Sequence, residues 1–265
     1  MRRPLRMLLS ALSLAASLAN AAPATPAQIY VNGVAPFAYA EQGVYRGVLY
    51  DMLAALRQRT GSAHTIRPVP LRRAQVMLAT QPEAIATLAR FAEVEQAYRW
   101  LCKLADDQLV LVTRAGSTHE IGSLAAVRQL RVGVLLGGPA ESAARRAGLA
   151  HIETVSSAAS NARKLANGRI DAWLTARSIA LFEQRGIGGS EQDLRIGPGL
   201  QTISQYLAAP LAMPEAHAAS WRAACATLQE DGTLERILAS YQQRRADDCQ
   251  QLSRSCLRPD RQAAP

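Results

Sequence analysis

The sequence predicts an α/β protein made of two units of similar size. Short apolar runs bounded by glycine or proline alternate with segments whose apolar residues recur at helical spacing. The same alternation is present in both halves of the chain. Strands that alternate with helices form mostly parallel sheets with helices packed on them. Two such units predict a cleft between them, which is a common place for a small-ligand site.

The first half contains five expected elements. Val48, Met52 and Leu56 recur at helical spacing, and Gly61 follows them as a C-cap residue. Alternating or continuous apolar runs predict the strands on both sides of this helix. The elements are a strand at 29–34, a helix at 48–59, a strand at 65–69, a helix at 71–79 and a strand at 84–88.

The second half repeats this order. Gly137-Gly138-Pro139 separates an apolar strand from a helix, and Asn167-Gly168 ends the next helix. The elements are strands at 109–113, 130–136, 151–155, 170–174 and 202–208, and helices at 140–147, 156–166, 179–184, 214–229 and 233–243.

Residues 1–21 predict a signal peptide. Three arginines precede an apolar run at 7–18. Ala19-Asn20-Ala21 then supplies the small residues of a cleavage site, and no cysteine stands there to carry a lipid. The run is shorter than the ~20 residues of a membrane-spanning helix, and an uncleaved anchor is the alternative. We therefore expect export to the periplasm and release of a soluble chain.

Positive charge is spread along the chain. The formal net charge is +9, and three of the positive charges lie in the expected signal peptide. Where the other arginines are adjacent they form pairs and not a block, such as Arg72-Arg73 and Arg145-Arg146, with few aromatic residues beside them. A nucleic-acid interface needs clustered charge and stacking rings, so we expect no nucleic-acid partner.

Four cysteines fit an exported chain that forms disulfides, and they permit three connectivities. The short spacing of Cys249 and Cys256 favours a local bridge, worth about 2–3 kcal/mol in the chain-entropy model. Cys102 and Cys225 would then pair with each other. No histidine lies at ligand spacing from a cysteine, and we expect neither a metal nor a cofactor.

Six motifs occur in an order and spacing that together are specific. The chain resembles the bacterial extracellular solute-binding proteins of the polar amino-acid type (family 3), which serve ABC transporters, over nearly all of its expected mature length. The motifs are Pro36-Phe37-Ala38-Tyr39, Gly47-Val48-Leu49-Tyr50-Asp51, Pro70-Leu71-Arg72-Arg73-Ala74, residues 87–100, Asn167-Gly168-Arg169-Ile170-Asp171-Ala172-Trp173 and Asp231-Gly232-Thr233.

The resemblance implies a two-lobed periplasmic-binding-protein-like fold, in which each lobe is a mostly parallel sheet flanked by helices. Lobe one would comprise 28–113 completed by 203–257, and lobe two 117–200. A flexible tail would follow at 258–265. Two hinge strands, bending near 113–117 and 199–203, would let the lobes close on a ligand held in the cleft between them.

Members of this family that bind amino acids hold both charged ends of the ligand, and this chain departs from that pattern. By register, the arginine for the carboxylate falls on Val94 and the aspartate for the ammonium group on Ala176. The supporting hydroxyl falls within Gly137-Gly138-Pro139-Ala140. Alanine cannot offset a buried ammonium group, which costs several kcal/mol when unpaired. We therefore expect a small polar or anionic solute, either an amino acid or a related carboxylate.

Arg90 is the first candidate for the anion contact. It lies near the carboxyl end of its strand, where ligands of open α/β sheets bind. Thr87 or Arg73 would assist it. The alternative is a structural ion pair between Arg90 and an acidic residue of the next turn, Glu93 or Glu95.

Five further residues are candidates for the ligand site. Phe37 and Tyr39 follow the first strand, where they would line the cleft or belong to the core. Gly138 lies in a turn before a helix, which is a place where anions bind, and Ser142 is the first hydroxyl of that helix. Trp173, at the end of its strand, would face either the core or the cleft.

Three functions are compatible with these features. The first is a monomeric substrate-binding protein that delivers its solute to an inner-membrane ABC permease. The second is a periplasmic sensor or partner protein of the same fold, which signals to a membrane receptor. The third is a dehydratase-like enzyme, which needs a general acid such as Glu93, Asp51 or His64. No motif fixes any two of these acids, so we expect a binding protein and no catalytic residues.

Overall fold

The structure is a computed structural model that describes residues 28–241. The predicted signal peptide, the predicted Cys249–Cys256 bridge and the predicted tail at 258–265 lie outside these residues. Within them, ten strands form an eight-stranded sheet, in the order β4-β1-β5-β10-β6-β9-β7-β8, and a separate hairpin of β2 and β3.

The elements begin and end as follows. The strands are β1 (Gln28–Asn32), β2 (Tyr39–Glu41), β3 (Val44–Arg46), β4 (Thr65–Val69), β5 (Ile85–Arg90), β6 (Arg99–Arg114), β7 (Arg131–Leu135), β8 (His151–Val155), β9 (Ala172–Ala176) and β10 (Leu194–Ala209). The helices are α1 (Val48–Thr60), α2 (Leu71–Thr80), η1 (Ala92–Val94), α3 (Pro139–Arg146), α4 (Ala158–Ala166), α5 (Arg177–Gly186), η2 (Glu191–Asp193) and α6 (Glu215–Glu230), followed by helical residues 233–241.

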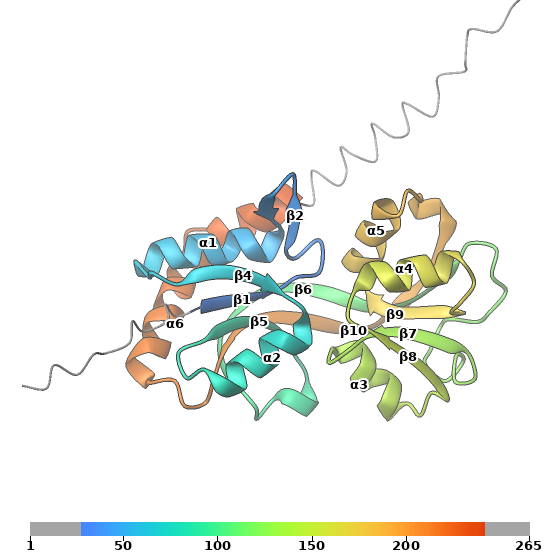
Figure 1. Cartoon of the computed structure of the whole chain (residues 1–265), viewed down its shortest axis with the longest axis horizontal. Coiled ribbons are helices and arrows are strands. Elements are labelled where there is room, and N and C mark those ends of the chain that lie inside the picture. Colours follow the sequence, from blue (N-terminus) through green and yellow to red (C-terminus); the bar gives the residue numbers. More distant parts are fainter. Residues whose placement is uncertain (1–27, 242–265) are drawn as a thin grey trace, which may run out of the picture.

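Two lobes share the large sheet, as predicted (Figure 1). Lobe one contains the parallel strands β4, β1 and β5 with α1, α2 and α6, and lobe two contains the parallel strands β9, β7 and β8 with α3, α4 and α5. The 16-residue strands β6 and β10 are antiparallel and run through both lobes. The residue limits predicted for the two lobes are not tested by these strand pairings and stay a prediction.

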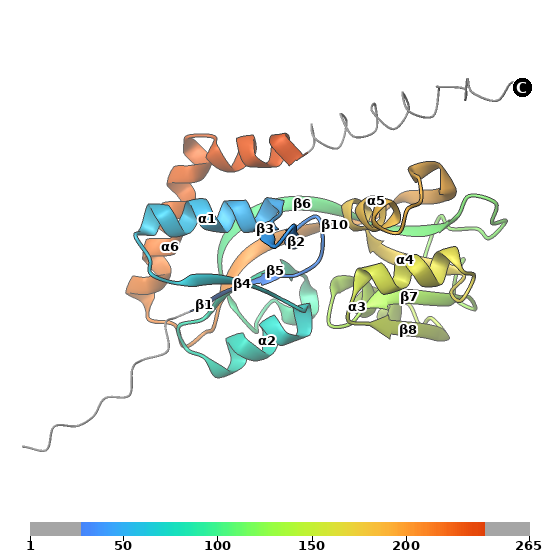
Figure 2. The same ribbon diagram turned by 45° about the horizontal axis from the view of Figure 1, so that its top comes forward.

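The lobe-one sheet is covered differently on its two faces. Ile29 and Val31 of β1 pack in the core formed with α1, whereas Tyr30 between them packs with Leu71 and Leu78 of α2. Figure 2 shows α1 and α6 together on one side of this sheet and α2 on the other. The period-two alternation of β1 therefore supplies both cores.

The main differences from the predicted elements are in the long strands and the hairpin. Lys103, Asp106 and Asp107 are polar and interrupt the apolar run, so β6 was expected to begin only at residue 109. The β2–β3 hairpin consists of six mostly exposed residues and has no buried periodicity to reveal it. Its turn places Gln42 and Gly43 at positive φ, 50° and 80°.

A disulfide joins Cys102 of β6 to Cys225 of α6, which confirms the second predicted pair. The two Cα atoms lie 6.1 Å apart, within the normal range for a bridge. The bond fastens α6 to a strand that also enters lobe two. Across residues 28–241, no helix has the length and apolar character needed to cross a membrane.

Candidate functional site

The carboxyl ends of the parallel strands of both lobes face one another. Three contacts between the segments that follow these strands define this region, which we call the interlobe face. Gln75 Nε2 donates a hydrogen bond to Gly137 O at 2.9 Å. Arg146 forms an ion pair with Glu93, and the rings of Tyr39 and Phe182 lie 4.9 Å apart, centroid to centroid. Ligands of α/β sheets bind at such carboxyl ends.

The Gly137–Gly138 turn lies directly against α2. Gly137 has φ of 76°, which favours glycine, and a Cβ there would lie 2.9 Å from Gln75 Oε1. A Cβ at Gly138 would meet Leu71 Cδ2 at 3.5 Å. The two glycines therefore permit a close approach of the lobes.

The predicted anion site at this turn is already filled by a carboxylate of the chain. Gly137 N donates to Glu141 Oε2 at 2.7 Å, and Arg145 donates twice to Glu141 Oε1. Burial by itself would raise the pKa of Glu141, but the Gly137 amide and Arg145 outweigh it and hold the pKa below its ordinary value. Gly138 N donates to the Leu135 carbonyl, and Ser142 Oγ accepts from Arg146.

Arg90 lies at the end of β5 and is paired within the protein. Its Nε donates to Glu95 Oε2 at 2.8 Å, its Nη2 bonds the other carboxylate oxygen, and its guanidinium lies over the rings of Trp100 and Tyr206. The hydrogen bond to Glu95 raises the pKa of Arg90, and Arg90 in turn lowers the pKa of Glu95. About a third of the Arg90 side chain and of the Glu95 side chain remains exposed. The two hydrogen bonds between Arg90 and this carboxylate are therefore accessible to solvent.

Thr87, on the same strand as Arg90, forms a buried polar pair with Asn32 of β1. Thr87 is fully buried, and its Oγ1 accepts a hydrogen bond from Asn32 N at 3.0 Å. Asn32 is 6% exposed, and its Oδ1 has no hydrogen-bond partner among residues 28–241. A buried acceptor without a partner is costly, which makes Asn32 a candidate that the sequence did not indicate.

The other predicted site residues are dispersed. Tyr39 reaches the interlobe face through Phe182. Phe37 and Trp173 are 4% and 1% exposed and belong to the main apolar core, which was the alternative for both. Arg73 does not join the interlobe contacts; it lines a separate groove on lobe one.

Asp107 is a further functional candidate that sequence reasoning missed. Its carboxylate accepts hydrogen bonds from the backbone N–H of Ser178, at 3.3 and 3.4 Å, and from the Ser178 hydroxyl. It thereby ties β6 to the first turn of α5, where a negative charge is favoured. The signal for it was the adjacent Asp106-Asp107 pair just before the apolar residues 109–112.

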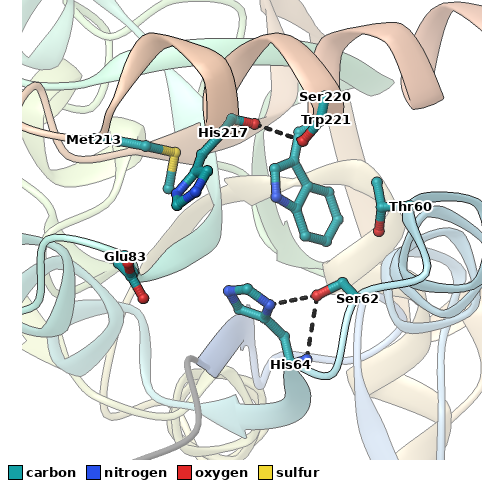
Figure 3. A pocket seen from close by; sticks show the side chains of 8 residues that line it. All are labelled: Thr60, Ser62, His64, Glu83, Met213, His217, Ser220 and Trp221. Atoms are coloured by element: carbon teal, nitrogen blue, oxygen red, sulfur yellow. Dashed lines mark hydrogen bonds between the residues drawn. The ribbon is translucent and has the colours of Figure 1, made fainter. Parts of the chain in front are cut away.

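A cavity of about 170 Å³ lies at the opposite end of lobe one (Figure 3). His64, His217 and Glu83 line it together with the buried ring of Trp221. Burial lowers the pKa of His64. Ser62 Oγ bonds His64 Nδ1 and also accepts from the His64 backbone N–H, so this pair belongs to one local turn. In the part of the chain that the structure describes, no three acidic, histidine or cysteine side chains could hold a metal ion.

Comparison with known proteins supports the fold. No protein-family model and no curated protein matches the sequence. Among solved structures, the substrate-binding protein of an amino-acid ABC transporter is 16% identical, with a TM-score of 0.70 over 81% of this chain and 97% of that one. A histidine kinase sensor domain similar to periplasmic binding proteins is 15% identical, with a TM-score of 0.73 over 81% and 95%.

A third match is the ancestral amino acid-binding protein AncCDT-1, a precursor of cyclohexadienyl dehydratase. It is 18% identical, with a TM-score of 0.69 over 81% of this chain and 93% of that one. At these identities the likeness shows the fold alone. The chain has the two-lobed α/β fold of periplasmic binding proteins.

Proposed function

We propose that this chain is a periplasmic substrate-binding protein that captures a small polar or anionic solute between its lobes and delivers it to a membrane permease. The observation that carries the proposal is the interlobe face, where the carboxyl ends of both parallel sheets meet across two long shared strands. The fold is also that of the binding protein of an amino-acid ABC transporter. A solute-binding protein needs two such opposed surfaces that close on its ligand.

Hinge bending would occur where the shared strands change neighbours. Residues 109–112 of β6 pair with β9, whereas residues 204–208 of β10 pair with β5. The register of β10 against β6 shifts on both sides of Gly199. We place the hinges at 106–109 and 199–204, the first of them earlier than the resemblance implied. Contacts made only in the closed state, such as Gln75–Gly137, would stabilise closure.

Arg90 is the proposed contact for a ligand carboxylate. Its guanidinium already donates two hydrogen bonds to the carboxylate of Glu95. This fork geometry also suits the carboxylate of a ligand. A ligand carboxylate would take the place of Glu95, with Asn32 Oδ1 accepting a ligand hydrogen. Because Glu141 fills the turn of lobe two and Ala176 carries no charge, a carboxylate without an ammonium group fits better than an amino acid.

A thermal-shift screen tests the proposal. The mature protein would be purified, unfolded and refolded to remove carried ligand, and screened against amino acids, dicarboxylates and aromatic acids. A ligand present at about 100 times its Kd stabilises by about 2.7 kcal/mol, which raises Tm by about 5–10 °C for this size. A shift that is lost in Arg90→Ala supports the proposal. No shift across the panel contradicts it.

The sensor function is the second candidate. It is favoured by the contacts that already join the lobes and by the filled turn at Glu141, which reduce the room for a solute. The fold also occurs in a histidine kinase sensor domain. Capture of an inner-membrane receptor by the immobilised protein, together with no ligand in the thermal-shift screen, would favour this function over transport.

An enzymatic role has the weakest support. The three acids that a dehydratase could use are far from forming one site. Asp51 accepts a hydrogen bond from Tyr241, Glu93 pairs with Arg146, and His64 lines the outer cavity of lobe one.

A further inference from the structure

Lobe one carries a second concave surface, away from the interlobe face. It is a groove of about 760 Å³, bordered by β1, β4, α2 and the segment after α2. It arises because α1 and α6 cover one face of the lobe-one sheet, whereas α2 alone covers the other (Figures 1 and 2). The volume lies within the range of small-molecule sites.

The floor of this groove is apolar and ordered. Tyr30 is 4% exposed, and its hydroxyl donates to Gln81 Oε1 at 2.8 Å, which holds the ring in place. Val69 and Met77 pack against the same small core as Tyr30. A flat apolar body, such as an aromatic ring, could be buried on this floor.

Two arginines border the floor from different elements. Arg67 of β4 is the register partner of Tyr30 of β1, so its side chain leaves the sheet on the same face. Arg73 of α2 lies one turn before Met77 on the side of the helix next to the groove. Within residues 28–241, neither guanidinium makes a hydrogen bond or ion pair, so both are available to an anion.

We propose that this groove binds an organic carboxylate with a flat apolar body. Its ring would lie on Tyr30 and Met77, and its carboxylate would be held by Arg67, Arg73 or both. Glu83 is the one acidic residue among those that line the groove, and it lies at the end shared with the cavity beside His64. A carboxylate is therefore expected at the arginine end. This site is independent of the proposed solute site between the lobes.

Titration of the full mature chain with 2-naphthoate tests the proposal, with 2-naphthalenemethanol as the neutral probe of similar shape. Binding would be followed by calorimetry, and its place by the backbone amide NMR shifts of Tyr30, Met77 and Ala84. We expect saturable binding of the acid, at least tenfold weaker binding of the alcohol, and shifts at these three amides. Binding of both probes with equal affinity, or no binding of the acid at millimolar concentration, overturns the proposal.

Matched variants separate the groove from other sites. Arg67→Gln/Arg73→Gln should weaken naphthoate binding at least tenfold, because both guanidinium groups are lost while a polar side chain remains at each position. Arg57→Gln/Arg59→Gln, two exposed arginines of α1, should leave it unchanged, as should Arg90→Ala. If the groove variant binds naphthoate like the wild type, the site is refuted. If Arg90→Ala alone abolishes binding, naphthoate lies between the lobes, and the groove proposal fails while the solute-binding proposal gains support.

Discussion

The side-chain amide of Gln75 donates a hydrogen bond to the backbone carbonyl of Gly137, 2.9 Å away and in the other lobe. Gln75 is itself buried and also accepts from Arg72. Together with the Glu93–Arg146 ion pair, this bond holds the two lobes against each other through contacts of the protein alone. On the proposed function, a ligand would add its own contacts to this arrangement.

Removing these contacts should favour the open arrangement. A net hydrogen bond is worth about 1 kcal/mol and an exposed ion pair about 0.2–1 kcal/mol. Gln75→Ala/Arg146→Ala should therefore shift the balance roughly tenfold toward open, and small-angle scattering should report a larger radius of gyration. Arg99→Ala, which removes an ion pair with Glu215 inside lobe one, is the control. An unchanged radius in the double variant would contradict a role in closure.

Arg90 and Glu95 should have opposite effects on solute binding. Arg90→Ala should weaken binding of a carboxylate solute by roughly 30-fold or more, because a two-point charged contact is lost. Arg90→Lys should recover part of this loss. Glu95→Gln should tighten binding several-fold, since it removes the competing carboxylate. Affinities from calorimetry decide the matter: if both Arg90→Ala and Glu95→Gln bind like the wild type, the pair is only structural.

The Cys102–Cys225 bridge should contribute substantially to stability. It closes a loop across a sequence separation of 123 residues, and native bridges are typically worth about 2–4 kcal/mol. Cys102→Ala/Cys225→Ala should lower Tm by about 5–15 °C without loss of the fold. Non-reducing peptide mapping checks the pairing directly. A peptide that links Cys102 to Cys249 or Cys256 would contradict it.

His64 should make stability depend on pH. Burial lowers its pKa below 6.5, with His217 adding to this effect and Glu83 opposing it. The folded state therefore prefers neutral His64, so stability is retained above about pH 6.5 and falls as the pH drops toward the lowered pKa. His64→Gln should show a smaller decrease in Tm between pH 7.5 and 5 than the wild type. The exposed His217→Gln should change this decrease less, and equal decreases in wild type and His64→Gln would refute the linkage.

Much of the fold was predictable because its elements are periodic in sequence. Val48, Met52 and Leu56 lie on one buried face of α1, and Gly61 is its left-handed C-cap. Strand β6 was predicted only in part, because Lys103 and Asp106 are exposed in a segment that bridges the lobes. A strand with one solvent-exposed, polar segment loses the apolar pattern that identifies it in a sequence.

The candidate site was predictable only where the partners are close in sequence. The pairing of Arg90 with Glu95, five residues away, was foreseen as an alternative. The Gln75–Gly137 bond joins residues 62 positions apart in different lobes, and no local pattern indicates it. Arg73 was expected to assist Arg90 at the anion contact, but the side of α2 on which it lies places it in the outer groove.

The course of the chain through the sheet has a consequence for the order in which the lobes fold as the chain emerges. Strand β5 has β1 on one side and β10 on the other, so the lobe-one sheet lacks an interior strand until residues 204–208 have emerged. Lobe two, by contrast, takes its strands β7, β8 and β9 from one uninterrupted stretch. Local contacts form faster than distant ones. We therefore expect lobe two to complete first, and lobe one to stay open to chaperones or proteases until the last quarter of the chain arrives.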